Sequence, residues 1–329
     1  MGIPKLNKWL LDKCSPASIQ KQHLIDLQDK CIAIDISIYL YRFLVEGHFM
    51  EQLYLFLSTL RYYCIRPIIV FDGKAPAEKR ATIQRRKTEK QDAKTQYLVL
   101  EEQLTHTEDI LLRQELQKKM AALKKRMVRI TWAYIDASID LIKAFGFEYY
   151  LAPHEADELC VHLALTGDVY AILSDDMDLL LSGVPRLLRG FHISTHEVIL
   201  YDTSAILVDM NMTLSDFRAT VALSGTDYEL NTPRPNMAIK RCFELYEEYR
   251  VENNGETLID WLGHKGIIDP VEYRHICSMF EHKSELADFV NKNKPIPCKM
   301  RLAEIRAIMR PHKFIFPGHL ATSEHMLDV

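Results

Sequence analysis

The sequence has no apolar run long enough to cross a membrane and no closely spaced pair of cysteines. Its apolar stretches fall short of the ~18–20 residues that span a bilayer. Met1–Leu11 also lacks the long apolar centre of a secretion signal. The seven cysteines are scattered and odd in number, which argues against a disulfide framework or a zinc knuckle. We therefore expect a protein of a reducing compartment, the cytoplasm.

Glycine and proline are absent between Pro76 and Gly146. Good helix formers, mainly Lys, Arg, Glu, Gln, Leu and Ala, dominate this segment, which should be helical throughout. A single straight helix of this length would extend roughly 100 Å at ~1.5 Å per residue. No domain of this size could support it alone, so the segment must fold back on itself.

The sequence THT at 105–107 is the expected break in this helical segment. We predict helices at Ala75–Leu104 and Glu108–Arg129, forming an antiparallel excursion from the rest of the fold. A more apolar helix, Thr131–Ala144, should then return to the core. A coiled-coil oligomerisation arm is the alternative, but the apolar residues keep no clean heptad.

The net charge of −4 conceals a strong local asymmetry. From Lys74 to Arg129 there are 15 basic and 8 acidic residues, a net charge of +7, which leaves the rest of the chain at −11. Such a split suggests an anionic partner that meets one region of the protein. The plainer interpretation, a solvated helical face, is weakened because the basic run begins directly after Asp72.

Acidic residues follow several short apolar runs of the kind that form buried parallel strands. Asp35 ends the run CIAID (31–35), Asp72 ends IIVFD (68–72), and SDDMD (174–178) follows VYAIL (169–173) directly. The pattern predicts an α/β fold with a mainly parallel sheet and helices on both faces. Its strand ends would deliver these acids to one rim, where open sheets of this class bind ligands.

Two further acids, Glu155 and Asp157, open a predicted helix at 153–167. At about 100° per residue they flank its apolar stripe and can reach the same rim. Glu158 and His162 should point the other way, toward water.

Clustered carboxylates repel one another unless cations offset their charge, and hard divalent ions prefer oxygen ligands. Any one of these acids could be a turn former or a helix cap, but the set favours a site for Mg²⁺ or Mn²⁺. The expected metal ligands are Asp35, Asp72, Glu155, Asp157, Asp176, Asp178 and Asp227.

Six short blocks occur in order along the first three quarters of the chain. They are MGIPKL (1–6), AIDISIYLYRF (33–43), VFDGKAPAEKR (70–80), PHEADE (153–158), SDDMDLL (174–180) and LSGTDYEL (223–230). In order and spacing they resemble the signature blocks of the flap-endonuclease/XPG family of structure-specific nucleases. The resemblance covers most of residues 1–245.

The resemblance implies a DNA nuclease that uses two Mg²⁺ or Mn²⁺ ions at 5′ ends, flaps or junctions. It assigns the first ion to Asp35, Asp72, Glu155 and Asp157, and the second to Asp157, Asp176, Asp178 and Asp227. Asp175 is left without a defined role.

The same resemblance implies a set of DNA contacts. Lys79 and Arg86 would grip the scissile phosphate, and Tyr41 would stack on a terminal base unless it is simply a core aromatic. The full expected set of DNA-contacting residues is Gly2, Tyr41, Lys74, Lys79, Arg80, Arg85 and Arg86.

The expected segments are an N-terminal nuclease part (1–73), a basic helical arch (74–130), an internal nuclease part (131–230) and a helical DNA-binding and C-terminal region (231–329).

The chain departs from the family pattern at several points. Lys5 stands where the family usually has glycine, and residues 231–249 carry Pro233 and Pro235 but no glycine. A glycine turn that binds duplex DNA through potassium is therefore not expected there. No sliding-clamp peptide of the form QxxLxxFF occurs.

These departures resemble a divergent viral member of the family, of the poxvirus type, acting in the host cytoplasm in viral DNA replication, recombination or repair. A catalytically weak DNA-binding or bridging protein and an RNA-directed 5′ exonuclease are the alternatives.

Overall fold

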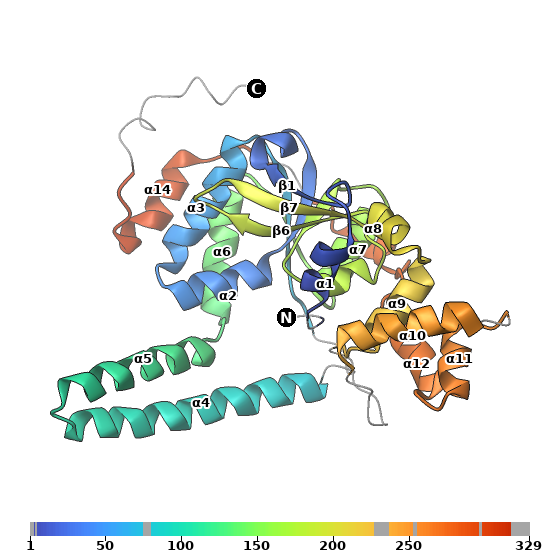
Figure 1. Cartoon of the computed structure of the whole chain (residues 1–329). Coiled ribbons are helices and arrows are strands. Elements are labelled where there is room, and N and C mark those ends of the chain that lie inside the picture. Colours follow the sequence, from blue (N-terminus) through green and yellow to red (C-terminus); the bar gives the residue numbers. More distant parts are fainter. Residues whose placement is uncertain are drawn as a thin grey trace.

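The computed structural model describes residues 3, 5–74, 80–226, 237–252, 255–295 and 298–316, without the side chains of residues 80–83 and 86. Within this part of the chain seven strands form one sheet, in the order β1-β7-β6-β5-β2-β3-β4 (Figure 1). The strands are β1 Ile19–His23, β2 Cys31–Asp35, β3 Arg66–Phe71, β4 Glu148–Leu151, β5 Ala171–Leu173, β6 Arg186–His192 and β7 Glu197–Asp202.

The predicted α/β class with a mainly parallel sheet is confirmed. Strands β4, β3, β2, β5 and β6 pair in parallel, whereas β7 and β1 form an antiparallel edge. The three strands expected from the apolar runs occupy the centre of this sheet, and each ends at or just before its acidic residues. The carboxyl ends of β2, β3 and β5 therefore lie at one rim.

Helices cover both faces of the sheet, which explains why the central strands are apolar without alternation. On β2, Ala33 packs into one core while Ile32 and Ile34 pack into the other. The helices are α1 Leu6–Lys13, α2 Ile36–Glu46, α3 Phe49–Tyr62, α4 Arg80–His106, α5 Ile110–Met127, α6 Trp132–Ala144, α7 Ala156–Leu165, α8 Thr203–Met210, α9 Leu214–Ala222, α10 Ile239–Glu252, α11 Leu258–His264, α12 Pro270–Ser278, α13 Leu286–Lys292 and α14 Leu302–Met309. Helices α1, α7, α8 and α9 contribute to the first core, and α2, α3, α6 and α14 to the second. None of the described helices is both long and apolar enough to span a bilayer.

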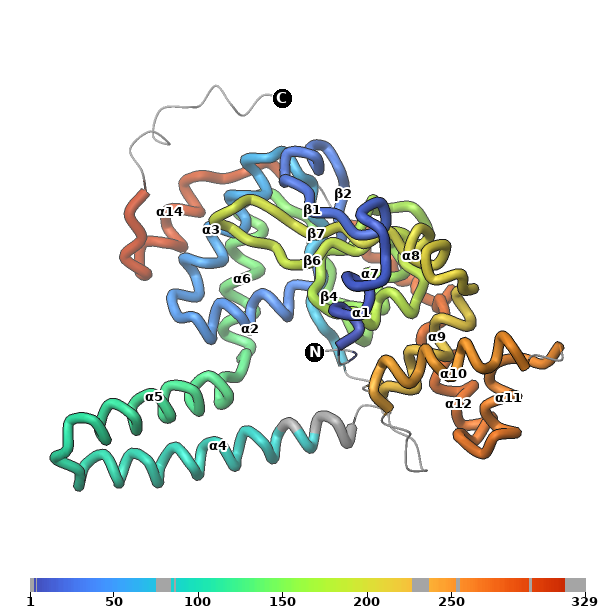
Figure 2. Tube along the Cα trace, in the orientation of Figure 1, coloured from blue at the N-terminus to red at the C-terminus, as the bar shows by residue number. Residues whose placement is uncertain are grey.

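The basic segment forms a long antiparallel helical hairpin that extends away from the sheet (Figure 2). Leu116, Met120 and Leu123 of α5 are buried. The break lies at residues 107–109, two residues later than expected, because the Asp109 side chain caps α5 by accepting hydrogen bonds from the backbone N–H groups of Leu111 and Leu112. The returning helix α6 begins at Trp132, with Thr131 as its N-cap, close to the prediction.

The C-terminal region is divided between two parts of the fold. Helices α10 to α12 pack beside α9, whereas α14 packs against α6 near the other face of the sheet. The chain between them passes α7 at residues 279–283, near the rim that carries the acids.

Candidate active site

Asp35 and Asp72 lie next to each other at the ends of β2 and β3. Asp35 caps α2 by accepting a hydrogen bond from the Ser37 N–H at 3.2 Å, and the Ser37 hydroxyl donates to Asp72 Oδ2 at 2.6 Å. The other Asp72 oxygen accepts a hydrogen bond from the Ala156 N–H at 2.9 Å. Asp72 therefore joins the end of β3 to the beginning of α7, the helix that carries the next two acids.

The loop after β5 brings two more acids to the same rim. Ser174 donates a hydrogen bond to Asp35 at 3.4 Å and accepts one from the Asp176 N–H at 3.2 Å. Asp176 in turn accepts from the Asp178 N–H at 3.1 Å. The Asp178 carboxylate accepts from the Ile3 N–H at 3.1 Å, which places the N-terminal segment beside the site.

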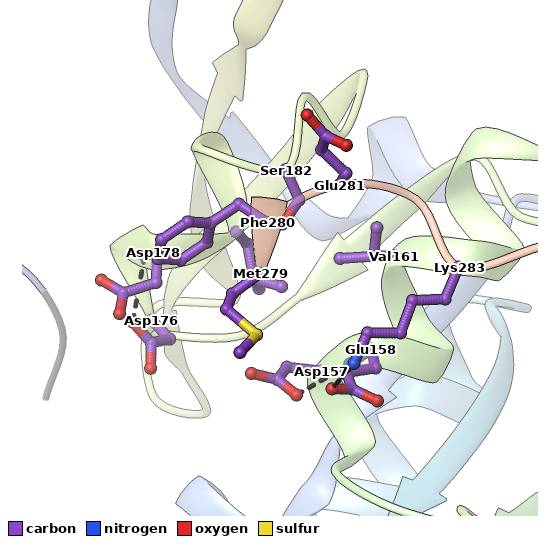
Figure 3. Close-up of a pocket in the computed structure, with 11 residues that line it drawn as sticks. Asp157, Glu158, Val161, Asp176, Asp178, Ser182, Met279, Phe280, Glu281 and Lys283 are labelled. Carbon is purple, nitrogen blue, oxygen red and sulfur yellow. Dashed lines mark hydrogen bonds and ion pairs between the residues drawn. The ribbon is translucent and has the colours of Figure 1, made fainter. Parts of the chain in front are cut away.

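Helix α7 supplies Glu155, at its N-cap position, and Asp157 in its first turn. Both side chains are half-buried. Figure 3 shows Asp157 facing Asp176 and Asp178 across a pocket. The dipole of α7 favours negative charge at this end of the helix.

The charges of these acids interact strongly. Asp35 is 8% exposed, and burial raises its pKa well above the usual range, with further increases from Asp72, Asp157 and Asp176. Burial also raises the pKa of the Cys160 thiol, and the charges of Asp35, Asp157 and Asp72 raise it further. Such a set of oxygen donors, whose negative charges destabilise one another, suits hard divalent cations.

Among the described residues, no three side chains already surround one point closely enough to hold an ion. The Asp72, Asp176 and Asp178 carboxylates instead each accept hydrogen bonds from protein donors. We expect ion binding to draw these oxygens together.

Replacing Asp35 by Asn should stabilise the metal-free protein. Because the pKa of Asp35 is raised in the folded state, its contribution to stability is present below its unfolded pKa and is lost as pH rises through the folded pKa. At pH 7.5 in EDTA we expect Asp35→Asn to raise Tm by about 2 °C or more, the shift that ~1 kcal/mol produces in a large domain. Calorimetry should also show weaker stabilisation by added Mg²⁺ than in the wild type. A lower Tm in EDTA would contradict this account of the site.

Asp175, which the sequence leaves without a defined role, holds the acidic loop after β5 (residues 174–178) in place. Its carboxylate pairs with Arg42 of α2 and accepts a hydrogen bond from the Gly190 N–H at 2.9 Å. Its backbone carbonyl accepts two hydrogen bonds from the Arg189 guanidinium, at 2.9 and 3.2 Å. Asp175 is therefore directed away from the other acids.

Tyr41 lies beneath the helical hairpin. The residue is 36% exposed, its hydroxyl donates to the Lys125 carbonyl of α5 at 3.3 Å, and Lys90 Nζ of α4 lies 5.9 Å from its ring centroid. The ring is accordingly not a buried core aromatic. Lys74, after β3, and Arg85, in α4, are both exposed.

Not all of the expected site residues belong to the described part of the chain. Gly2, Lys79 and Asp227 lie outside the described residues, as do the side chains of Arg80 and Arg86.

The expectation that Glu158 and His162 face water is wrong. The His162 side chain is 2% exposed, and its Nδ1 lies 3.0 Å from His282 Nε2. The Glu158 side chain is 9% exposed and pairs with Lys283. The segment after α12 covers this face of α7, and no local periodicity could reveal a contact with residues so distant in sequence.

The buried His162 should make stability fall in mild acid. Burial, and then His282, lower its pKa below the ordinary value of 6.5. Its contribution to stability is therefore present above pH 6.5 and is lost as pH falls through the lowered pKa. A hydrogen bond with the Lys283 backbone and the charge of Asp168 oppose these effects and raise the pKa, without cancelling the decrease. We expect urea unfolding between pH 7 and 5 to show a smaller loss of stability in His282→Gln than in the wild type. The same change at the exposed His106 should leave the pH dependence unaltered, and equal slopes in all three proteins would contradict the assignment.

An α/β sheet with carboxylates at its strand ends and a basic helical hairpin beside them is an arrangement suited to metal-dependent cleavage of nucleic acids. Comparison with known proteins agrees. The XPG N-terminal domain matches residues 1–93, and the XPG I-region matches residues 146–227. The chain belongs to the flap-endonuclease (XPG) family of hydrolases.

Individual relatives support this membership. Flap endonuclease 1 of Mus musculus is 29% identical over 268 residues, covering 76% of this chain and 67% of its own length. That of Mycosarcoma maydis is 30% identical over 276 residues, covering 77% and 69%. The chain spans a smaller share, 62%, of the Glycine max enzyme.

Solved structures share the fold. The catalytic core of Rad2 in complex with DNA substrate has a TM-score of 0.65 at 21% identity, covering 94% of this chain and 95% of that one. Human GEN1 in complex with Holliday junction DNA has a TM-score of 0.59 at 14% identity, covering 99% and 77%.

Proposed function

We propose that this protein is a divalent-metal-dependent, structure-specific DNA nuclease that cuts at 5′ flaps and junctions and degrades DNA from 5′ ends. The observation that carries the proposal is the gathering of acids at one rim, where Ser37 joins Asp35 to Asp72 and Ser174 joins Asp35 to Asp176 by hydrogen bonds. Burial, and then the charges of Asp72, Asp157 and Asp176, raise the pKa of Asp35. Clustered acids alone would repel a DNA backbone, so a mere DNA-binding protein gains nothing from them. Relatives named as flap endonucleases, and a similar structure bound to junction DNA, favour flaps and junctions as substrates.

The site residues fit a pair of Mg²⁺ or Mn²⁺ ions, because every donor is a carboxylate oxygen. Asp35, Asp72, Glu155 and Asp157 would hold one ion, and Asp157, Asp176, Asp178 and Asp227 the other. Such ions, when bound, activate water and neutralise charge on the leaving oxygen.

The rest of the site orients the acids and the DNA. Ser37 and Ser174 fix Asp72, Asp35 and the loop after β5 by hydrogen bonds. Tyr41 is exposed beneath the hairpin, where a terminal base could stack on its ring. Basic residues of the hairpin attract the phosphate backbone, an effect that salt weakens.

A cleavage panel tests the proposal. Purified protein is incubated with flap, nicked, blunt and single-stranded DNA and with RNA, in Mg²⁺ and in EDTA. We expect cutting of branched or 5′-ended DNA in Mg²⁺ only. Binding without cleavage would favour the DNA-bridging role, and preference for RNA would favour the 5′ exonuclease role on RNA. Either result would overturn the proposal.

The basic residues Lys79 and Arg86 are proposed to act on the scissile phosphate. Replacing both by Ala should lower the single-turnover rate by ~10²-fold or more, as expected for charges aimed at a developing transition state. Affinity for DNA should fall much less. Equal losses in rate and affinity would indicate simple electrostatic anchoring instead. Lys119→Ala is the matched control, because Lys119 is an exposed basic residue of the same hairpin that pairs with Glu115 at 2.7 Å, and it should keep the wild-type rate.

We also propose a viral setting, with action in the host cytoplasm in viral DNA replication, recombination or repair. Support comes from Lys5 and from the two prolines at 233 and 235, which depart from the family pattern.

Without a glycine turn in residues 231–249, the protein should bind duplex DNA independently of potassium. Equal DNA affinity in K⁺ and Na⁺ is the expected result, and a strong K⁺ requirement would count against this part of the proposal.

A further inference from the structure

The segment Met279–Lys283, which carries no recognisable sequence motif, forms one wall of the pocket at the acidic rim. In Figure 3, Met279 lies between Asp157 on one side and Asp176 and Asp178 on the other. The pocket has a volume of about 40 Å³, room for only a few water-sized groups. Its lining therefore determines which charges a bound ion would meet.

Three contacts hold this segment in place. Lys283 pairs with Glu158, and His282 stacks on His162 of the same helix, with ring centroids 5.1 Å apart. Glu281 lies 3.5 Å from Arg218 of α9. The segment is thus attached both to α7, the helix that carries Asp157, and to α9.

The Glu158 carboxylate needs a positively charged partner, and this segment supplies it. It follows Asp157 directly and lines the same pocket, but its Oε2 atom is buried without a hydrogen-bond partner among the described residues. Its Oε1 atom pairs with Lys283, the only cation among the described residues that line the pocket. Without that lysine, a buried carboxylate would stand uncompensated beside Asp157.

We propose that Lys283 is a positioning residue of the active site, which holds Glu158 away from the acids that would bind the second ion. The proposal rests on the proposed function of the site, because it assigns Asp157 to metal binding. Lys283 neutralises Glu158 and fixes its direction, so that Asp157 alone of this helical turn faces Asp176 and Asp178. When Lys283 is lost, Glu158 is free to turn toward Asp176 and Asp178 and to bind an ion in an unproductive arrangement.

Lys283→Met should therefore tighten metal binding and slow the reaction. One added net negative charge at the pocket should raise Mn²⁺ affinity about fivefold in a calorimetric titration, as expected for a nearby charge in a partly screened setting. The value of kcat on flap DNA should fall about tenfold or more, while KM and DNA affinity in EDTA change less than about twofold.

A second variant separates positioning from a merely structural role. Because the glutamine side chain carries no charge, Lys283→Met combined with Glu158→Gln should restore both Mn²⁺ affinity and kcat to within about twofold of the wild type. Lys265→Met is the matched control, since the Lys265 side chain is about as exposed as that of Lys283 and pairs with Glu252 at 2.7 Å, an exposed partner in the helical region away from the rim. It should change neither quantity.

Two results would overturn the proposal: unchanged Mn²⁺ affinity in Lys283→Met, or failure of Glu158→Gln to restore the double variant. The Mn²⁺ titration does not depend on cleavage. If the wild type cuts no DNA but the titrations follow the expected pattern, the proposed function fails and the role of Lys283 stands.

Discussion

Replacing Asp72 by Asn is expected to reduce DNA cleavage by about 10²–10⁴-fold, the effect of losing several kcal/mol of transition-state stabilisation supplied by a bound ion. Asp72 is positioned by Ser37 and by the N–H of Ala156, at 2.6 and 2.9 Å. Asparagine has nearly the same shape and keeps one acceptor oxygen, so the fold should survive. DNA binding in EDTA should be retained or slightly tightened, because a negative charge at the rim is removed.

Single-turnover cleavage and a binding titration with the same flap DNA measure the two quantities. Asp140→Asn is the control, since Asp140 is an exposed acid on α6, and it should cleave at the wild-type rate. The variant Glu155→Gln/Asp157→Asn should behave like Asp72→Asn. Cleavage by either active-site variant at the wild-type rate would show that these acids do not hold catalytic ions.

Replacing Gly73 by Ala is expected to damage the site through the backbone. A Cβ atom at this position would lie 1.9 Å from the Ala152 carbonyl oxygen and 3.0 Å from the His154 carbonyl oxygen. The Gly73 N–H donates to His154 at 2.6 Å, so the two chain segments cannot separate without losing this bond. The displacement must reach Asp72 on one side and Glu155 on the other.

We expect Gly73→Ala to lose about 1–3 kcal/mol of stability, the usual cost of forcing extra atoms into a packed region. Cleavage should fall at least about tenfold beyond what the unfolded fraction explains, because the acids on both segments move. Urea unfolding and cleavage assays measure the two effects. Lys74→Ala, at the exposed neighbouring position, should leave stability unchanged. A Gly73→Ala variant of wild-type stability and rate would show that the two segments have room to adjust.

The central sheet could be predicted because its strands are continuous apolar runs that end in acids. The β2 prediction, residues 31–35, agrees with the structure at both ends. By contrast, β4 has only four residues, and β6 carries charged residues and a glycine within its span. Such short or mixed segments become strands through pairing with distant partners, and local sequence does not record those partners.

The position of the described acids at the strand ends could be predicted for the same reason, but their partners from distant parts of the chain could not. Asp35 is the N-cap of α2 and accepts a hydrogen bond from the N–H of Ser37 two residues later, a local capping pattern that the sequence does indicate. Arg42 reaches Asp175 across 133 residues, and Lys283 reaches Glu158 across 125. Contacts of that separation follow from the tertiary fold, which is why Glu158 and His162 were wrongly assigned to solvent.

The most direct test is an anomalous diffraction map from crystals of the protein soaked in Mn²⁺. We expect two ions at the strand-end rim, one against Asp35, Asp72 and Asp157 and the other between Asp157 and the loop with Asp176 and Asp178. Manganese absent from this rim, or bound only elsewhere on the chain, would contradict the assignment of these acids as a two-ion site.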